Sequence, residues 1–298
     1  MNTLPAPLDV EPAPPSTGAE ATREDKQWVV VERIAQARRD PDRILQHAID
    51  EGLAQCRRPT ASLGLSAVGA GLIVGFSAMA VGVVSSMVSS GELALPVRLA
   101  QAMVYPLGFV MCVVSGTELY TEHTATSLYP ALDRRTGFAG VLRVWATVLV
   151  GNLIGAALSA ALLTLADPVV GAAEGYGMVG HHLVDPSAGG LFVSSLLAGW
   201  LMAMGAWLVL ATPPGVAEVA AIFVVTFLIG LGGLHHSIAG SVEAFLAWWV
   251  AGVLGPWDVL RFVGIAAAGN LVGGSVFVAL LNHGHLRSTR AGVNESHA

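Results

Sequence analysis

Two polar clusters interrupt an otherwise apolar sequence, and their residue types indicate chemistry on a small charged solute. The first cluster runs from Gly116 to Thr126 and the second from Gly232 to Glu243. Each combines glycine with hydroxyl, carboxyl and imidazole groups. An imidazole has an unperturbed pKa near ~6.5, so a histidine can hydrogen-bond a weak acid or exchange a proton with it near neutral pH.

The ionisable and hydroxyl groups of these clusters are the candidate site residues. They are Glu118, Thr121, Glu122, His123, His235, His236 and Glu243. We expect no metal site, because the histidines and glutamates show no ligand spacing on one helix face. No cofactor motif or nucleophile–base pair is present, so we expect neither a cofactor nor an enzyme. The net charge of −6 gives no basic footprint for nucleic acid.

The chain that must position these groups has the composition of a membrane protein. Hydrophobic residues make up 54% and charged residues 12%, whereas a soluble domain carries roughly 25% charge. The mean hydropathy is +0.64. Residues 1–58 contain 18 of the 36 charged side chains, so the remainder is strongly depleted in charge. We therefore expect an all-α integral membrane protein.

Six apolar stretches follow the charged N-terminal segment. They cover residues 59–91, 99–117, 144–166, 187–212, 219–234 with an apolar continuation, and 262–281. About 20 residues cross a ~30 Å hydrocarbon layer, so six transmembrane helices are predicted. The polar clusters then break the second and fifth helices. Residues 128–132 could form a second half-helix that ends at Arg134 and Arg135, although the first cluster could instead be a loop after a completed span.

The distribution of basic residues predicts the topology. Of the 15 lysines and arginines, 13 fall on one side if both termini are cytoplasmic, and Arg98 and Arg261 fall on the other. We expect a multi-pass protein of the inner (plasma) membrane. The predicted parts are a cytoplasmic segment 1–58, a pore domain 59–284 and a cytoplasmic tail 285–298. Within the first part, residues 1–22 are expected to be disordered, and two short amphipathic helices are expected over 24–58, with a break near Pro41.

A short motif occurs twice, which indicates an internal repeat. Gly151–Gly155 reads GNLIG and Gly269–Gly273 reads GNLVG, and each follows a polar break. Three spans per repeat is an odd number, so the halves must have opposite orientations, as in many transport proteins. Close helix packing through small residues would also explain the motif. Its repetition beside two polar breaks favours a pore-lining role for Asn152 and Asn270.

The chain resembles the formate/nitrite transporter family over about residues 60–285. The matching pieces are Gly108–Phe109, Cys112–Val114, Glu118–Thr121, His236–Ala239 and both GNLxG motifs. This resemblance implies an aquaporin-like protomer of six helices, assembled as a homopentamer in the lipid membrane with one pore per protomer. It also implies that small monovalent anions of weak acids, such as formate or nitrite, are the substrates.

The resemblance also implies roles for individual residues. His236 is similar to the central pore histidine, and Thr121 to the threonine that hydrogen-bonds it. Residues matching the constrictions and the paired asparagines complete the set: Leu119, Tyr120, Tyr105, Phe109, Ile229, Asn152, Ile154 and Asn270.

The chain departs from the family pattern on the outer side. The family usually carries a vestibule lysine before the fourth span, and here His181 and His182 occupy that region. His235 replaces a common glutamate, and Gly240 replaces a common asparagine. We therefore expect low affinity for anions and an uptake that rises as the external pH falls.

These observations predict a proton-linked route for a weak acid. An unpaired charge is costly to bury, so the anion is expected to take a proton near His236 and Thr121, from His236 or from water, and to cross as the neutral acid. Two alternatives stay open. The first is a pore for neutral or cationic solutes, because Glu118, Glu122 and Glu243 lie near the proposed path. The second is a non-conducting membrane sensor or scaffold. Residues 1–58 are expected to be dispensable for assembly.

Overall fold

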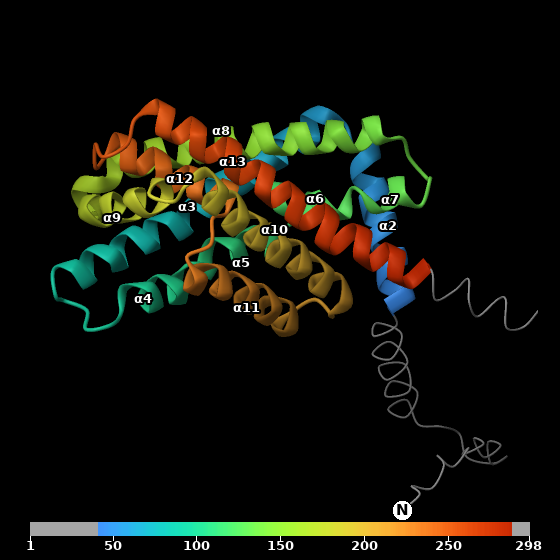
Figure 1. Ribbon diagram of the computed structural model, residues 1–298, viewed down its shortest axis with the longest axis horizontal. Coiled ribbons are helices and arrows are strands. Elements are labelled where there is room, and N and C mark those ends of the chain that lie inside the picture. Colours follow the sequence, from blue (N-terminus) through green and yellow to red (C-terminus); the bar gives the residue numbers. More distant parts are fainter. Residues whose placement is uncertain (1–40, 288–298) are drawn as a thin grey trace, which may run out of the picture. The chain divides into compact units, whose positions relative to one another are not determined.

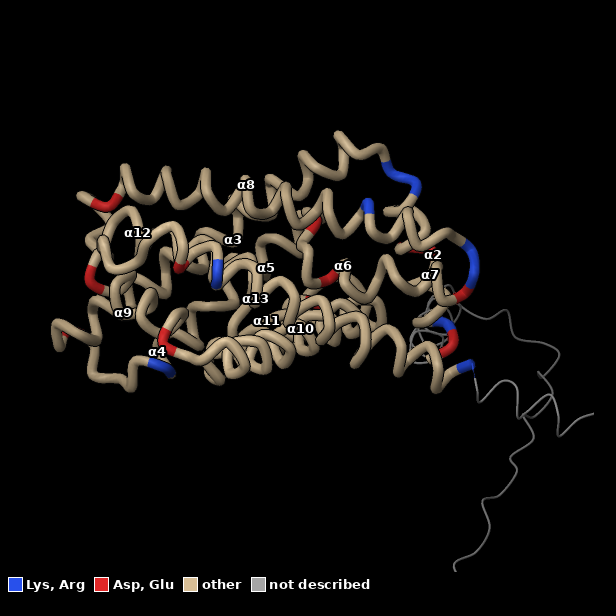
Figure 2. The backbone as a smooth tube through the Cα atoms, turned by 45° about the horizontal axis from the view of Figure 1, so that its top comes forward, with Lys and Arg blue, Asp and Glu red and all other residues tan. Residues whose placement is uncertain are grey.

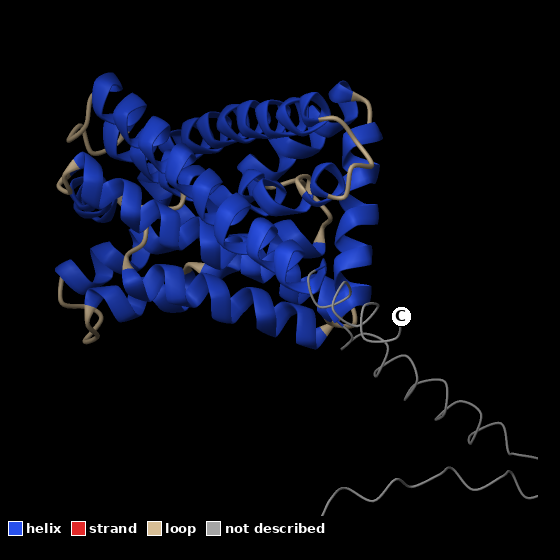
Figure 3. Ribbon diagram, turned by 45° about the vertical axis from the view of Figure 1, so that its right-hand side comes forward, coloured by secondary structure: helices blue, strands red, loops and turns tan. Residues whose placement is uncertain are grey.

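The computed structural model describes residues 41–287, and within that range every regular element is helical (Figure 3). This confirms the all-α class. The disorder predicted for residues 1–22, the helix predicted before residue 40 and the end of the C-terminal tail lie outside the described residues. The helices are α2 (Pro41–Arg57), α3 (Thr60–Ser89), α4 (Val97–Val104), α5 (Pro106–Val114), α6 (Tyr120–Thr126), α7 (Tyr129–Leu132), α8 (Phe138–Val170), α9 (Ala173–Val184), α10 (Ala188–Ala211), α11 (Val216–Gly232), α12 (Ser237–Trp249) and α13 (Pro256–Gly274), which continues as a π-helix at Ser275–Leu280.

The long helices provide the predicted membrane spans, and most of them run roughly along one direction (Figure 1). Five are long and apolar enough to cross a membrane: Thr60–Ser89, Val97–Val114, Phe138–Val170, Ala188–Ala211 and Pro256–Arg287. The helices α11 and α12 together form a sixth span that is bent by 49°. The chain is therefore an integral membrane protein with six spans when the bent pair is counted as one.

Both predicted breaks occur, and each begins with a glycine in the left-handed region. Gly116 has φ +67° after the end of α5, and Gly233 has φ +59° after the end of α11. A side chain is strained in that conformation, so glycine allows both helices to stop. The first cluster is only partly a loop, because the residues from Tyr120 to Thr126 form α6.

The repeated GNLxG motifs bring pairs of helices into close contact. The helix α3 packs along α8, and α10 packs along α13. A Cβ added at Gly155 would lie 2.2 Å from the carbonyl oxygen of Val68, and one added at Gly273 would lie 2.1 Å from that of Leu196. Close packing through small residues is therefore one function of the motif.

The N-terminal helix α2 belongs to the same compact body as the spans. Its residues Leu45, Ala48 and Ile49 are buried in one cluster with Ala125 and Tyr129 of the broken second span. Figures 1 and 2 both show α2 beside α7. A boundary at residue 58 would thus separate α2 from the spans on which it packs. We therefore restrict the expectation of dispensability to residues 1–40.

Candidate functional site

Two cavities follow one another along α11. The histidine cavity, of about 180 Å³, is lined by Arg98, Gln101, Tyr105, His182, Ile229, His235, His236, Glu243 and others. The α6 cavity, of about 190 Å³, is lined by Glu51, Glu118, Glu122, His123, Thr126, Met202, Val225 and others. Each cavity takes polar groups from one of the two breaks. The arrangement provides two polar chambers with apolar residues between them.

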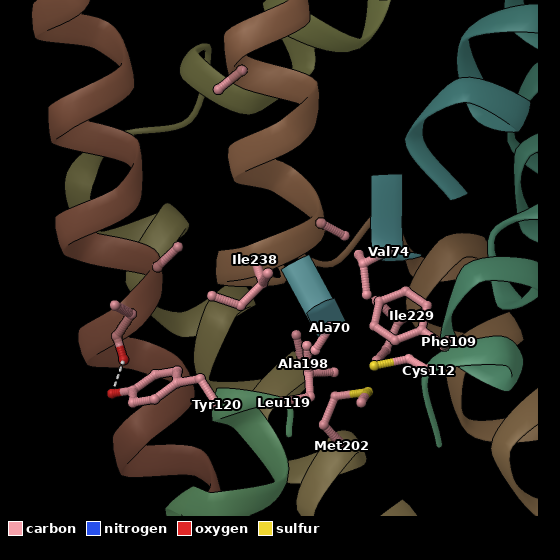
Figure 4. Close-up of a cluster of buried hydrophobic side chains, with 14 of the residues drawn as sticks. Ala70, Val74, Phe109, Cys112, Leu119, Tyr120, Ala198, Met202, Ile229 and Ile238 are labelled. Carbon is pink, nitrogen blue, oxygen red and sulfur yellow. Dashed lines mark hydrogen bonds between the residues drawn. The ribbon is translucent and has the colours of Figure 1, made fainter. Parts of the chain in front are cut away.

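The separation between the cavities is made of apolar side chains. Phe109, Leu119 and Ile229 are fully buried and belong to one core cluster, together with Met202. Figure 4 shows these four side chains gathered around one point. The ring of Tyr105 lies 5.1 Å from that of Phe109, on the side of the histidine cavity. A permeant passing between the chambers would have to cross this apolar layer.

His236 lies at this layer and contacts Thr121, which is the partner that the family resemblance implies. Its Nε2 lies 2.9 Å from Thr121 Oγ1, and Phe109 meets the imidazole edge-on with ring centroids 5.0 Å apart. Both His236 and Thr121 are almost completely buried. The pair thus places a hydrogen-bonding group inside an apolar constriction.

The second imidazole nitrogen of His236 determines its tautomer. Nδ1 accepts hydrogen bonds from the backbone N–H groups of Ile238 and Ala239, at 3.2 and 3.3 Å, and so caps the start of α12. An accepting nitrogen carries no proton, so the proton of the neutral ring is on Nε2 and is donated to Thr121. A second proton would break the cap and face the positive end of the helix dipole. We conclude that this geometry holds His236 neutral.

The two asparagines hold the backbone of the breaks. Asn152 accepts from the N–H of Tyr120 at 2.8 Å and donates to the carbonyl of Glu118 at 2.9 Å. Asn270 accepts from the N–H of Ser237 at 2.7 Å and donates to the carbonyl of His235 at 3.1 Å. The same pattern therefore flanks Leu119 in one break and His236 in the other. Neither asparagine is among the residues that line these two cavities, and their hydrogen bonds hold the backbone of the breaks in place.

Two other residues that the resemblance places at the pore lie elsewhere. The hydroxyl of Tyr120 donates to the carbonyl oxygen of Ala267 at 3.4 Å, and Figure 4 shows its ring turned toward α13 and away from the apolar layer. Ile154 is 50% exposed, on the outer surface of α8. Ile154 points away from the break because it lies two residues, or about half a helical turn, after Asn152. We do not retain either residue in the path.

The histidine cavity contains a permanent cation that the motif analysis did not select. Arg98 lines it and donates to the carbonyl of Gly232 at 3.3 Å. His182 also lines it, and its Nε2 lies 2.9 Å from the carbonyl oxygen of Gly233. His181 is not among the residues that line this cavity. His182 stacks on His235, with ring centroids 5.1 Å apart. The position of Arg98 before α5, opposite the second cluster, became evident only from the fold.

His235 is held by neighbouring helices. Its Nδ1 lies 2.7 Å from Ser194 Oγ of α10, and the residue is only 3% exposed. These contacts fit a packing role at the wall of the histidine cavity, beside His182.

The α6 cavity carries a network that joins the first break to α2. Glu118 is paired with Arg58, and its other oxygen lies 2.6 Å from His123 Nε2. Gln55 of α2 donates to Glu118 at 3.1 Å. The carboxylate beside the constriction therefore has cationic and amide partners. Among residues 41–287, no group of three or more His, Cys, Asp or Glu side chains could hold a metal ion.

Known proteins share the sequence and the fold. The family model described as "Formate/nitrite transporter" matches residues 42–284. The chain is 26% identical to "Inner membrane protein YfdC" of Escherichia coli (strain K12), covering 86% of this chain and 82% of that protein. It is also 26% identical to "Probable formate transporter" of Methanothermobacter thermautotrophicus, covering 71% and 84%.

Two solved structures share the fold at 19% identity. "FNT family ion channel" has a TM-score of 0.72 and covers 82% of this chain and 98% of its own. "Pentameric formate channel with formate bound" has a TM-score of 0.61 and covers 74% and 95%. Broken spans that meet between two polar cavities define a membrane channel or transporter. The chain belongs to the formate/nitrite transporter family.

Proposed function

We propose that this protein conducts small monovalent anions of weak acids, such as formate or nitrite, through one pore in each protomer of a homopentamer. The observation that carries the proposal is the His236–Thr121 hydrogen bond at an apolar layer between two polar cavities. The names of a formate transporter among its relatives and of a formate channel among its structural neighbours support the same substrate class.

The proposed path begins in the histidine cavity. Arg98 attracts the anion there at every physiological pH, because a guanidinium stays protonated. This makes a vestibule lysine unnecessary. At the apolar layer the charge must be neutralised, since an unpaired ion is costly to bury. Thr121 accepts from His236, so its own hydroxyl proton is free to be donated to the permeant.

The orientation follows from the charges. Figure 2 shows a cluster of lysine and arginine residues at the end of the body that holds α2 and α7. By the positive-inside rule this end, with both termini, is cytoplasmic. The histidine cavity then opens to the outside, the α6 cavity faces the cytoplasm, and the two three-span halves have opposite orientations. A cell inner (plasma) membrane is the proposed location.

The carboxylate of the α6 cavity that lies beside the constriction, Glu118, does not favour a cation pore. Glu118 is neutralised by Arg58 and hydrogen-bonded to His123. A free ring of carboxylates is the feature that selects cations. We therefore keep the weak-acid anion as the substrate, with neutral or cationic solutes and a non-conducting sensor as alternative outcomes of the test.

The test is solute flux into proteoliposomes containing the purified full-length protein. Formate, nitrite, acetate, a neutral solute and a monovalent cation are compared across pH, with His236→Phe as the blocked variant. Anion uptake by the native protein, lost in His236→Phe at unchanged pentamer content, is the expected result. Flux of only the neutral solute or the cation, or no flux of any solute, would overturn the proposal.

A further inference from the structure

A second ionisable residue in the histidine cavity is not used by the path described so far. Glu243 lies on α12, seven residues after His236. Seven residues are about two helical turns, so Glu243 lies on the same face as His236 and about 10 Å further along the helix. Both residues line the histidine cavity.

The surroundings of Glu243 are unusual for a carboxylate. The residue is only 7% exposed, and its neighbours along α12, Val242 and Ala244, are completely buried. Within residues 41–287, its carboxyl oxygens have no hydrogen-bond or ion-pair partner. An isolated carboxylate in a membrane interior is expensive and marks a functional site by default. In such a setting the neutral, protonated acid is the favoured form.

The other titratable groups facing this cavity come from few elements. Four helices pack against α12, and they are α3, α8, α9 and α13. The helix α9 presents one titratable group to the cavity, His182. Among the described residues, α3, α8 and α13 present none there. The rest of the set is Arg98 of α4, Tyr105 at the end of α4, and His235 and His236 of the second break.

Of this set, Glu243 is the carboxyl group and shares one face of α12 with His236, whereas His235 is held by Ser194 of α10. Arg98 does not release its proton at physiological pH. The ring of His236 is neutral, with Nδ1 accepting from the start of α12 and Nε2 bonded to Thr121. A protonated Glu243 would be neutral beside the incoming anion, and Arg98 in the same cavity would stabilise the carboxylate left behind.

We propose that Glu243 is the proton-donating residue of the pore, which transfers its proton to the weak-acid anion in the histidine cavity. In this step the O–H bond of the Glu243 carboxyl breaks and an O–H bond forms on the anion. The permeant becomes the neutral acid and Glu243 becomes a carboxylate. A proton from water on the outer side then restores the carboxyl group, so each neutral acid that crosses carries one proton. This inference rests on the proposed function.

The transport test uses Glu243→Gln, which keeps size and hydrogen bonding but cannot titrate. Glu174→Gln is the matched control, because Glu174 is an exposed carboxylate of α9 outside this cavity. Formate uptake and internal acidification of proteoliposomes are recorded across pH. We expect Glu243→Gln to lower formate uptake about tenfold or more and to flatten its pH dependence, while its melting temperature is unchanged or higher. Native uptake and acidification in Glu243→Gln would overturn the proposal.

A second measurement does not depend on transport. The infrared spectrum of the reconstituted protein at neutral pH should contain the carbonyl band of a protonated carboxylic acid, which Glu243→Gln removes and Glu174→Gln retains. A spectrum unchanged by Glu243→Gln would show that the residue holds no proton. If native protein moved no anion, the proposed function would fail, and this spectrum would still decide whether Glu243 is protonated.

Discussion

The role of Asn270 can be tested by a single substitution. Its side chain is fully buried and makes three hydrogen bonds to backbone, from Ser237 N–H at 2.7 Å, to the Ser195 carbonyl at 2.6 Å and to the His235 carbonyl at 3.1 Å. Asn270→Ala removes all three. It leaves one N–H and two carbonyl groups of buried backbone without these partners, on both sides of His236.

The magnitude follows from the number of bonds. A hydrogen bond between helices in a membrane protein contributes about 0.6 to 1.7 kcal/mol. Three such bonds amount to about 2 to 5 kcal/mol of the free energy of unfolding. The loss also frees the segment that places His236 against Thr121, so transport should fall more steeply than stability.

The assay combines unfolding in detergent with flux in proteoliposomes. Asn270→Asp is the informative partner, because it retains the oxygen that accepts from Ser237 and loses both donated bonds. We expect Asn270→Asp to be no more stable than Asn270→Ala, because its second carboxylate oxygen would face the Ser195 and His235 carbonyl oxygens without a proton to donate, and we expect both variants to be inactive. Asn152→Ala, which removes the equivalent bonds at the first break, should behave like Asn270→Ala. Native stability and flux in Asn270→Ala would refute the reasoning.

Four further outcomes are expected. Thr121→Val should abolish uptake by removing the hydroxyl bonded to His236, and Thr121→Ser should restore it; equal activity of both variants in the flux assay would argue against that bond. Arg98→Gln should lower uptake at subsaturating formate by roughly tenfold at low ionic strength and less at high salt, because attraction into a cavity is screened; salt-independent uptake would contradict this role. Removal of residues 1–40 should leave pentamers intact in size-exclusion chromatography and leave flux unchanged. Removal through residue 57 should lower the melting temperature, because α2 packs on the second span. A native melting temperature in the longer truncation would show that α2 is dispensable. A reporter fused after residue 298 should show activity on the cytoplasmic side, and activity on the outer side would contradict the proposed topology.

His236 illustrates how the structure changes a prediction made from the sequence. The sequence leaves His236 or water as the source of the proton, and a titrating His236 would make His236→Asn pass solute while losing pH dependence or anion preference. With Nδ1 occupied by the start of α12, the ring has no free site for a second proton. We now expect uptake by His236→Asn to stay dependent on pH, because we assign the titrating group to Glu243. A pH-independent His236→Asn with a native Glu243→Gln profile would restore the original assignment.

The sequence by itself determined the membrane class, the number of spans and the two breaks. Each of these depends on local composition. Runs of about 20 apolar residues predict the spans, and the breaks are indicated by polar residues within those runs and by glycines that permit a left-handed backbone. The GNLxG repeat and the family resemblance also pair His236 with Thr121, and their side chains lie 2.9 Å apart in the structure.

The tertiary structure decided what each side chain faces. Asn152 and Asn270 bind backbone, Tyr120 turns toward α13, and Arg98 enters the histidine cavity from a helix that carries no motif. Such directions depend on helix rotation and on partners 32 to 147 residues away, which local sequence patterns do not encode. The packing of α2 against the second span has the same origin, because its buried face is complementary to a surface that exists only after the spans assemble.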